Sequence, residues 1–439
     1  MARSSYRRPY RGGRRREAGG GGTRFLAVLL AAALLGGAFW LLPRLSGGGK
    51  GEGELPSPVG SSSGSSDGNA LKGSEAPDGE YRAVWFSYLD LADILTGKDE
   101  VEFTDSINRE FQNCKEMGLN TVIVQVRPYS DALYPSKLFP YSKYAAGKQG
   151  QDPGFDPLKI MVELSHQKGL KIEAWINPYR ISSAADSAPC AENPGAKWFA
   201  DGATRGDWVV QVGEGLYYNP AIPQVQDLIV SGVEEILQNY AVDGIHFDDY
   251  FYPSDADDSF DAAAYQRYRD GGGQLSLGDF RRANVDALVQ RVYRAVKDEN
   301  PALVFGISPQ GNVDNCYRSM YADVKKWASQ PGYVDYIAPQ IYWGYSHPQA
   351  SARYDVKISE WNSYCKEPSV KLYIGLAAYR MGDEATGFSQ NGDDMARMVA
   401  DARKKSAYGG FILFRYQNLT DGGEIAQKEV GNLKALLQK

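Results

Sequence analysis

Histidine and cysteine are scarce in this sequence, which argues against most protein metal sites. The chain of 439 residues has three histidines, His166, His246 and His347, and they lie far apart. Its four cysteines include no Cys-x-x-Cys pair. A zinc site needs three or four such ligands, usually at short spacings. We therefore expect no metal and no cofactor, which disfavours metal-dependent deacetylation of a polysaccharide. One or two disulfides remain an alternative for a domain outside the cell.

An excess of positive charge is confined to the start of the chain. The formal net charge is −6, although the first 24 residues hold eight arginines against one acid, Glu17. The remainder is therefore acidic and would be repelled by the phosphates of a nucleic acid. We expect no nucleic-acid partner. The 29 tyrosines and eight tryptophans are typical of a well-filled core, and they also suit the stacking of sugar rings.

One long hydrophobic run is present, at residues 25–42, with Arg24 and Arg44 on either side. Its 18 uncharged residues form a helix of about 27 Å, close to the thickness of a bilayer's hydrocarbon core. The basic segment 1–24 should stay cytoplasmic, which places the rest outside. The sequence predicts a single-pass anchor in the cell membrane with an extracellular domain. A cleaved signal peptide is the alternative, but no small-x-small cleavage site follows the run.

Residues 46–77 are rich in glycine, serine and proline and cannot bury a core. We interpret them as a flexible linker that separates the anchor from a folded domain at 78–439.

The folded domain alternates between strand-like and helix-like segments. Eight short apolar, β-branched or aromatic runs lie at 81–88, 121–126, 171–176, 242–248, 303–307, 333–342, 371–377 and 409–414. Eight stretches with helical spacing lie at 103–117, 158–168, 223–240, 280–298, 318–329, 356–365, 394–405 and 424–437.

This alternation predicts an α/β fold with a parallel sheet, and at this count the simplest closed form is a (β/α)8 TIM barrel. An open doubly wound sheet would need a glycine-rich loop after its first strand, and none follows Tyr88. Two connections, about 178–221 and 251–279, are long enough to form the walls of a groove.

Polar and aromatic residues follow most of the predicted strands, where barrel active sites are built. Acids, amides, arginines and tryptophans on one rim suit a carbohydrate, which needs hydrogen bonds to its hydroxyls and flat surfaces for its rings. The candidate substrate-binding residues are Trp85, Arg127, Asp131, Tyr134, Glu173, Trp175, Asn177, Arg180, His246, Tyr250, Gln340, Tyr342, Trp343 and Arg415.

Asp248 and Asp249 are the candidate catalytic residues. Strand alternation puts neighbouring side chains on opposite faces, but near a strand end it can break, and both carboxylates can then reach the cleft. The alternative is structural, with one acid capping the next segment and the other bonding backbone. The position on the fourth strand, with His246 before the pair and aromatics after it, favours catalysis.

Six motifs together resemble the glycosyl-hydrolase-like family 10 of bacterial envelope proteins. They are RAVWFSYLD (82–90), VRPYSDALYPS (126–136), EAWINPYR (173–180), DGIHFDDYFYP (243–253), GISPQGN (306–312) and PQIYWGY (339–345). The resemblance covers about residues 81–436 and implies a (β/α)8 fold. It also implies hydrolysis of a glycan, such as peptidoglycan strands, outside the cytoplasm. The chain departs from a lipoprotein of that family in having no lipobox cysteine near its hydrophobic run.

Two mechanisms are compatible with adjacent aspartates. Glycosidases usually place two carboxyls about the scissile bond, so one aspartate could pair with Asp131, Glu173 or Asp383. Alternatively, the 2-acetamido group of the substrate is the nucleophile, with one aspartate orienting it and Tyr342 donating a hydrogen bond to it. The rival to an enzyme is a non-catalytic barrel that binds glycan and tethers the membrane to the cell wall.

Overall fold

The computed structural model describes residues 76–183, 188–254 and 256–438. The predicted basic segment 1–24, the anchor 25–42 and nearly all of the linker 46–77 lie outside these ranges. Within them, no helix has the length and apolar character needed to cross a membrane.

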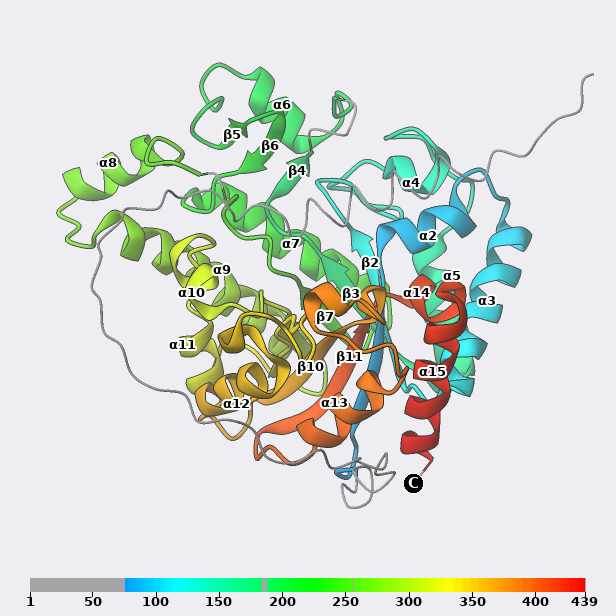
Figure 1. Cartoon of the computed structure of the whole chain (residues 1–439). Helices are drawn as coiled ribbons and strands as arrows, with labels where there is room; N and C mark the ends of the chain where they lie inside the picture. The colour runs from blue at the N-terminus through cyan, green and yellow to red at the C-terminus, as the bar shows by residue number, and fades with distance from the viewer. Residues whose placement is uncertain (1–75, 184–187, 255, 439) are drawn as a thin grey trace, which may run out of the picture. The chain divides into compact units, whose positions relative to one another are not determined.

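Eight parallel strands close into a barrel, as the alternation predicts (Figure 1). They are β1 (Tyr81–Phe86), β2 (Thr121–Arg127), β3 (Lys171–Ile176), β7 (Gly244–Phe247), β8 (Val304–Ile307), β9 (Tyr336–Ile337), β10 (Lys371–Ala377) and β11 (Tyr408–Phe414). Each strand pairs with its neighbour along this series, and β11 returns to β1. The carboxyl ends of all eight therefore open on one face, which we call the mouth.

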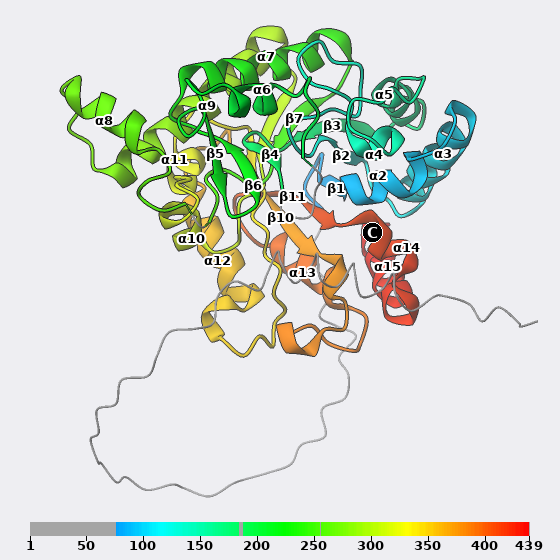
Figure 2. The same ribbon diagram turned by 90° about the horizontal axis from the view of Figure 1, so that it is seen from above.

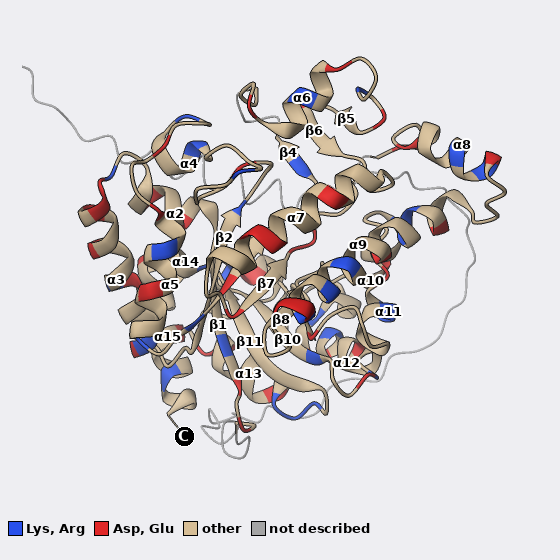
Figure 3. Ribbon diagram, turned by 180° about the vertical axis from the view of Figure 1, so that it is seen from behind, with Lys and Arg blue, Asp and Glu red and all other residues tan. Residues whose placement is uncertain are grey.

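Helices form a ring about the strands, seen from above in Figure 2. The long ones are α3 (Glu100–Glu116), α5 (Pro157–Gln167), α7 (Pro223–Asn239), α9 (Leu277–Glu299), α12 (Tyr354–Tyr364), α13 (Asp394–Ala402) and α15 (Gly423–Leu437). Helix α7 shows the sequence rule, because Val225, Ile229, Val233 and Ile236 recur at helical spacing and are all buried. Charges of both signs are spread over the outer helices (Figure 3).

Strand alternation divides the core into two layers. On β1, Val84 and Phe86 pack outward against helices, whereas Trp85 points into the barrel. The inner layer also holds Tyr81, Ala83, Ile123, Trp175, Tyr336, Ala338 and Ile412. Bulky side chains therefore fill the barrel interior, and a ligand has access only at the mouth.

Two predicted elements are shorter than expected. The helix expected at 318–329 is split into α10 (Val313–Arg318) and α11 (Val324–Ser329), because Tyr321 adopts a left-handed φ of 52°. The strand expected at 333–342 is reduced to β9, and Gln340 beyond it forms only isolated bridges. Pro339 has no N–H to continue the ladder.

The four cysteines are free thiols, so the disulfides considered above are absent. Cys114 and Cys316 are buried within the fold.

Both long loops carry structure of their own at the mouth. The loop after β3 holds β4 (Arg180–Ser182), α6 (Pro194–Ala200), β5 (Val209–Val212) and β6 (Gly215–Tyr218). Its strands form an antiparallel sheet in the order β4-β6-β5. The loop after β7 holds α8 (Ala262–Asp270). Figure 1 shows the first excursion standing above the barrel with α8 farther out beside it.

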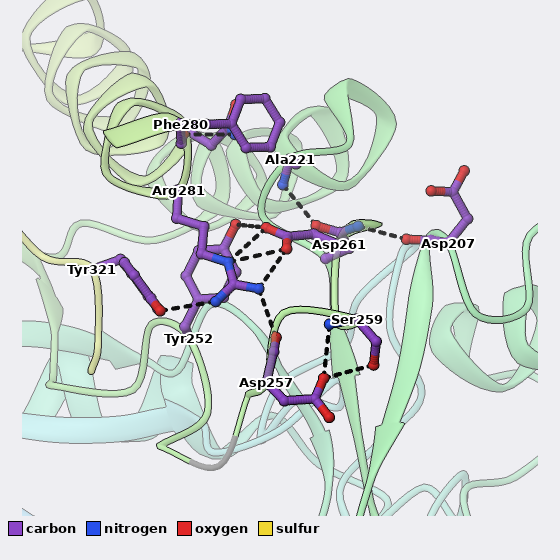
Figure 4. A network of polar contacts seen from close by, with 11 residues as sticks. Asp207, Ala221, Tyr252, Asp257, Ser259, Asp261, Phe280, Arg281 and Tyr321 are labelled. Carbon is purple, nitrogen blue, oxygen red and sulfur yellow. Dashed lines mark hydrogen bonds and ion pairs between the residues drawn. The ribbon is translucent and has the colours of Figure 1, made fainter. Parts of the chain in front are cut away.

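A buried ion pair fastens the loop after β7 to α9 (Figure 4). Arg281 and Asp261 are both fully buried, and their closest nitrogen and oxygen lie 2.6 Å apart. Arg281 also donates to the carbonyl of Asp257 and to the hydroxyl of Tyr321, while the hydroxyl of Tyr252 donates to Asp261. The loop that follows the aspartate pair is thereby tied to the outer ring of helices.

Candidate active site

Asp248 and Asp249 directly follow β7 and lie at the mouth. The register Ile176–Phe247–Ile307 places Asn177, Asp248 and Ser308 at one level on three neighbouring strands. Asp248 is only 3% exposed. Its Oδ2 accepts a hydrogen bond from Trp175 Nε1 at 3.1 Å, and its Oδ1 accepts one from the Tyr250 N–H at 3.1 Å. Both oxygens of Asp248 are therefore held.

Asp249 is partly exposed and is held from the opposite side by amides. Gln340 Nε2 donates to Asp249 Oδ1 at 3.1 Å and to the carbonyl of Ser308 at 3.0 Å. Gln310 also bonds to the Asp249 carboxylate. Asp249 is therefore the more exposed carboxylate of the pair.

The aspartate pair retains a proton at pH values at which an ordinary carboxyl has lost it. Burial raises the pKa of Asp248, and the neighbouring charge of Asp249 raises it further. Burial likewise raises the pKa of Asp249, partly offset by the bonds from Gln310 and Gln340. Two adjacent carboxylates cannot both ionise freely in a poorly solvated site. The pair can therefore supply a general acid near neutral pH.

Arg180 brings a positive charge to the pair between two aromatic rings. Its guanidinium carbon lies 4.2 Å from the centre of the Tyr250 ring and 4.7 Å from that of Tyr129. Its Nη2 donates to the Tyr129 hydroxyl at 3.2 Å. The charge of Arg180 opposes the rise in the pKa of Asp248. One wall of the site is thus a cation held by tyrosines.

The opposite wall is aromatic. The ring of Tyr342 stacks on Phe414 with centres 5.7 Å apart and meets Tyr379 edge-on at 5.7 Å. The Tyr342 hydroxyl makes no hydrogen bond to any residue that the structure describes, so it can donate to a ligand. Trp343 is partly exposed and packs against Gly311, where an added Cβ would lie 2.7 Å from the indole.

Two further candidates hold polar groups at the rim. Asn177 Oδ1 accepts from Gln125 Nε2 at 2.8 Å, whereas the buried Asn177 Nδ2 has no partner among the described residues. Arg415 pairs with Asp90 of α2 (Tyr88–Leu95), with Nη1 and Oδ1 2.6 Å apart. Asn177 therefore keeps a buried donor without a partner among the described residues, whereas Arg415 is already paired.

Three predicted substrate-binding residues lie inside the barrel beneath the pair. Trp85 Nε1 donates to His246 Nε2 at 3.1 Å, and the carboxylate of Glu173 accepts from two tyrosines. All three are buried, and burial raises the pKa of Glu173 to about 7. They can support the aspartate pair from below, but they do not lie at the mouth.

Arg127, Asp131 and Tyr134 lie away from the pair. Arg127 stacks on Phe139 at 3.8 Å in the outer layer, and Tyr134 is fully buried. Asp131 accepts a hydrogen bond from Gln149 within its own loop. No described group of three or more histidine, cysteine, aspartate or glutamate side chains could hold a metal ion. A cavity of about 570 Å³ beside α10 is lined by neither Asp248 nor Asp249.

The sequence prediction missed several residues of the site. Gln310, Ser308, Tyr129, Tyr379 and Phe414 all contact the pair or its neighbours. Each lies at or just beyond the end of a barrel strand, so position alone could have indicated them. Their residue types are too common to stand out.

Comparison with known proteins agrees with this architecture. Residues 80–391 match the family described as Glycosyl hydrolase-like 10. Glycosyl hydrolase YngK of Bacillus subtilis is 36% identical over 369 residues, which span 78% of this chain and 69% of that protein. Glycosyl hydrolase DigH of Escherichia coli K12 is 36% identical over 296 residues, 62% of this chain and 65% of that protein.

Solved structures show the same fold at low identity. The PgaB (BpsB) glycoside hydrolase domain from Bordetella bronchiseptica superposes with a TM-score of 0.56 at 12% identity, over 81% of this chain and 99% of that one. The catalytic domain of β-amylase from Paenibacillus polymyxa gives 0.54 at 12% identity, over 82% and 100%. The match to the family and the two relatives decide the assignment: this chain belongs to glycosyl hydrolase-like family 10.

Proposed function

We propose that this protein is a glycoside hydrolase that cleaves glycosidic bonds in an N-acetylhexosamine-containing cell-wall glycan, such as the strands of peptidoglycan. Its family and the names of its relatives support a role on glycans. The observation that carries the proposal is the proton-holding pair Asp248–Asp249 at the mouth, between a tyrosine-held arginine and an aromatic wall.

The surroundings of the pair favour the acetamido group of the substrate as nucleophile. Each carboxylate considered as a second partner is engaged elsewhere. Glu173 is bonded inside the barrel, Asp131 accepts from Gln149, and Asp383 pairs with Arg380 at 3.1 Å. Adjacent residues on one strand can hardly flank both sides of a sugar ring. A nucleophile supplied by the substrate removes the need for a distant carboxylate.

In this mechanism the acetamido oxygen attacks the anomeric carbon as the glycosidic C–O bond breaks. Asp249, which is partly exposed, gives the proton that the pair shares to the leaving oxygen, so that Asp248 acts as the carboxylate. Asp248, buried with both oxygens held, orients the acetamide, and Tyr342 donates to it. Water then opens the cyclic intermediate and returns a proton to Asp249, so the anomer is retained.

The test is digestion of peptide-free peptidoglycan glycan strands by the purified full chain. We expect products from the wild type, and a loss of rate of about 100-fold or more in Asp248→Asn and Asp249→Asn. Asp383→Asn makes the same change at an acid of the rim and should retain the rate. De-N-acetylated strands should be cleaved far more slowly, and equal cleavage would exclude the acetamido nucleophile.

The second candidate is a barrel that binds glycan without cleaving it. The aromatic wall and Arg180 suit that function equally well. Binding without products, unchanged in both aspartate variants, would favour this candidate over the hydrolase.

A further inference from the structure

A chain of hydrogen bonds runs through the barrel interior beneath the aspartate pair. The Tyr336 hydroxyl lies 2.7 Å from His246 Nδ1 and 2.5 Å from Glu173 Oε2. The Tyr81 hydroxyl lies 2.6 Å from Glu173 Oε1. These four residues come from four different strands, β1, β3, β7 and β9. All four are buried.

A contact of His246 with Trp85 fixes which ring nitrogen of His246 carries the proton. Trp85 Nε1 can only donate, and it lies 3.1 Å from His246 Nε2. His246 Nε2 must therefore accept, and the ring proton is on Nδ1. The Nδ1–H then donates to the Tyr336 oxygen, and the Tyr336 proton goes to Glu173. Every donor in the chain finds an acceptor in this one direction.

The other tautomer does not fit these contacts. A proton on Nε2 could point to the Ser308 hydroxyl at 3.0 Å, but the Trp85 N–H at 3.1 Å would then have no acceptor on the ring, and Tyr336 would have to turn its own proton toward Nδ1. The contact of 2.5 Å between the oxygens of Tyr336 and Glu173 would then require a proton on Glu173, so this tautomer adds a second requirement to the loss of the Trp85 acceptor. Burial lowers the pKa of His246 to about 3, which keeps the ring neutral.

His246 connects this interior chain to the mouth. Its Nε2 lies 3.0 Å from the Ser308 hydroxyl. The carbonyl of Ser308 accepts from Gln340 Nε2 at 3.0 Å, and the same nitrogen donates to Asp249 at 3.1 Å. With Nε2 unprotonated, its lone pair is shared between the Trp85 N–H and the Ser308 hydroxyl, and the backbone that supports Gln340 is held in place.

We propose that Glu173 and Tyr336 are positioning residues, which fix His246 with its proton on Nδ1 and so hold Ser308 and Gln340 against Asp249. This inference rests on the proposed hydrolase function. Neither residue touches the substrate.

The chain offers a matched pair of variants, Tyr336→Phe and Tyr81→Phe. Each removes one buried hydroxyl that donates to Glu173, and both rings stack on Tyr373, at 4.5 Å and 4.2 Å between centres. Only the Tyr336 hydroxyl also contacts His246. A purely structural role for the cluster predicts equal effects of the two changes.

The readouts are the ¹⁵N shifts of the histidine ring nitrogens and the kinetics of glycan cleavage by the full chain. The three histidines allow His246 to be assigned with His166→Gln and His347→Gln. We expect Tyr336→Phe to move the His246 proton toward Nε2 and to lower kcat about tenfold with KM nearly unchanged. Tyr81→Phe should leave both readouts as in the wild type while lowering Tm to a similar extent.

Equal effects of the two variants on kcat, or unchanged His246 shifts in Tyr336→Phe, would overturn the inference while leaving the hydrolase intact. A wild-type chain that cleaves no glycan would overturn the proposed function. In that case the nitrogen shifts would still support or overturn the assignment of the His246 proton.

Discussion

The burial of Asp248 beside Asp249 comes at a cost to the folded state. Asp248 has an ordinary pKa of 3.8 when unfolded, and burial raises it in the fold. At pH values between the ordinary pKa and the raised pKa, the folded chain holds a proton that the unfolded chain has lost. Stability therefore falls as the pH rises through this window, because the folded state binds more protons. We attribute this cost in folding free energy to the proposed function of the pair, because the fold itself does not need two adjacent carboxyls there.

Asp248→Asn should accordingly stabilise the protein, and more so at higher pH. At about pH 5 the folded wild type keeps the proton and resembles the amide, whereas at about pH 9 it carries the unfavourable charge. The measurement is Tm of the two proteins across this range. Asp383→Asn serves as the control, and a gain from Asp248→Asn that shrinks with pH would contradict the assignment.

For single residues, the sequence predicted that the two aspartates follow a strand end. It did not predict how far below the mouth other polar residues lie inside the barrel. Strand alternation correctly puts Glu173, Trp175 and Asn177 on the inward side of β3. Asn177 follows the strand, Trp175 reaches Asp248, and Glu173 lies below both within the barrel. Depth depends on the stagger of neighbouring strands, which no single strand encodes.

The loop after β7 depends on one buried ion pair, and removing one partner should expose that dependence. Arg281→Met leaves the Asp261 carboxylate buried, with the Tyr252 hydroxyl as its one remaining side-chain partner among the described residues. We expect a loss of about 3–5 kcal/mol in the free energy of unfolding, measured by denaturant titration.

Arg282→Met is the matched control on the next residue. Arg282 pairs at 2.7 Å with Asp279, whose side chain is 49% exposed. The Arg282 side chain is itself 14% exposed, but Asp279 keeps its contact with water when Arg282 is replaced. We therefore expect a smaller loss than for Arg281→Met, closer to the contribution of exposed pairs, which is about 1 kcal/mol or less. Similar losses in the two variants would show that the buried pair is not what secures the loop.

Elements with strong periodicity were predicted well, and those interrupted by local geometry were not. Helix α7 follows its apolar spacing over its whole length. The predicted helix 318–329 has acceptable spacing, but the left-handed backbone at Tyr321 divides it. That conformation accompanies the contact of the Tyr321 hydroxyl with Arg281, a residue 40 positions away. Hydropathy patterns carry no information on such a contact.

At the scale of the whole molecule, the hydrophobic run at 25–42 remains a prediction, and we propose that it anchors the protein in the cell membrane. The full chain should sediment with membranes and resist extraction by salt, because about 18 apolar residues suffice to span a bilayer. A chain that lacks residues 1–45 should be released in soluble form. Protease added to intact cells should digest the barrel, and protection of the barrel would contradict an external location.

The barrel itself was predictable because eight strands and eight helices alternate along the chain. The closure of the sheet follows from that count, and the parallel order follows from the helical crossovers. The small sheet β4-β6-β5 was not predicted, since its strands have only three or four residues each and no clear alternation. Tertiary contacts stabilise it where sequence pattern does not.

Because the eight strands run in one direction, the N-terminal attachment of the domain and its mouth lie at opposite ends of the barrel. Strand β1 starts at Tyr81 on the floor of the barrel, and Asp248 and Asp249 lie at the other end of the strands. A linker that joins the domain ahead of Tyr81 is therefore attached at the end of the barrel opposite the mouth. If the domain were pulled from a surface through that linker, its mouth would face away from the surface.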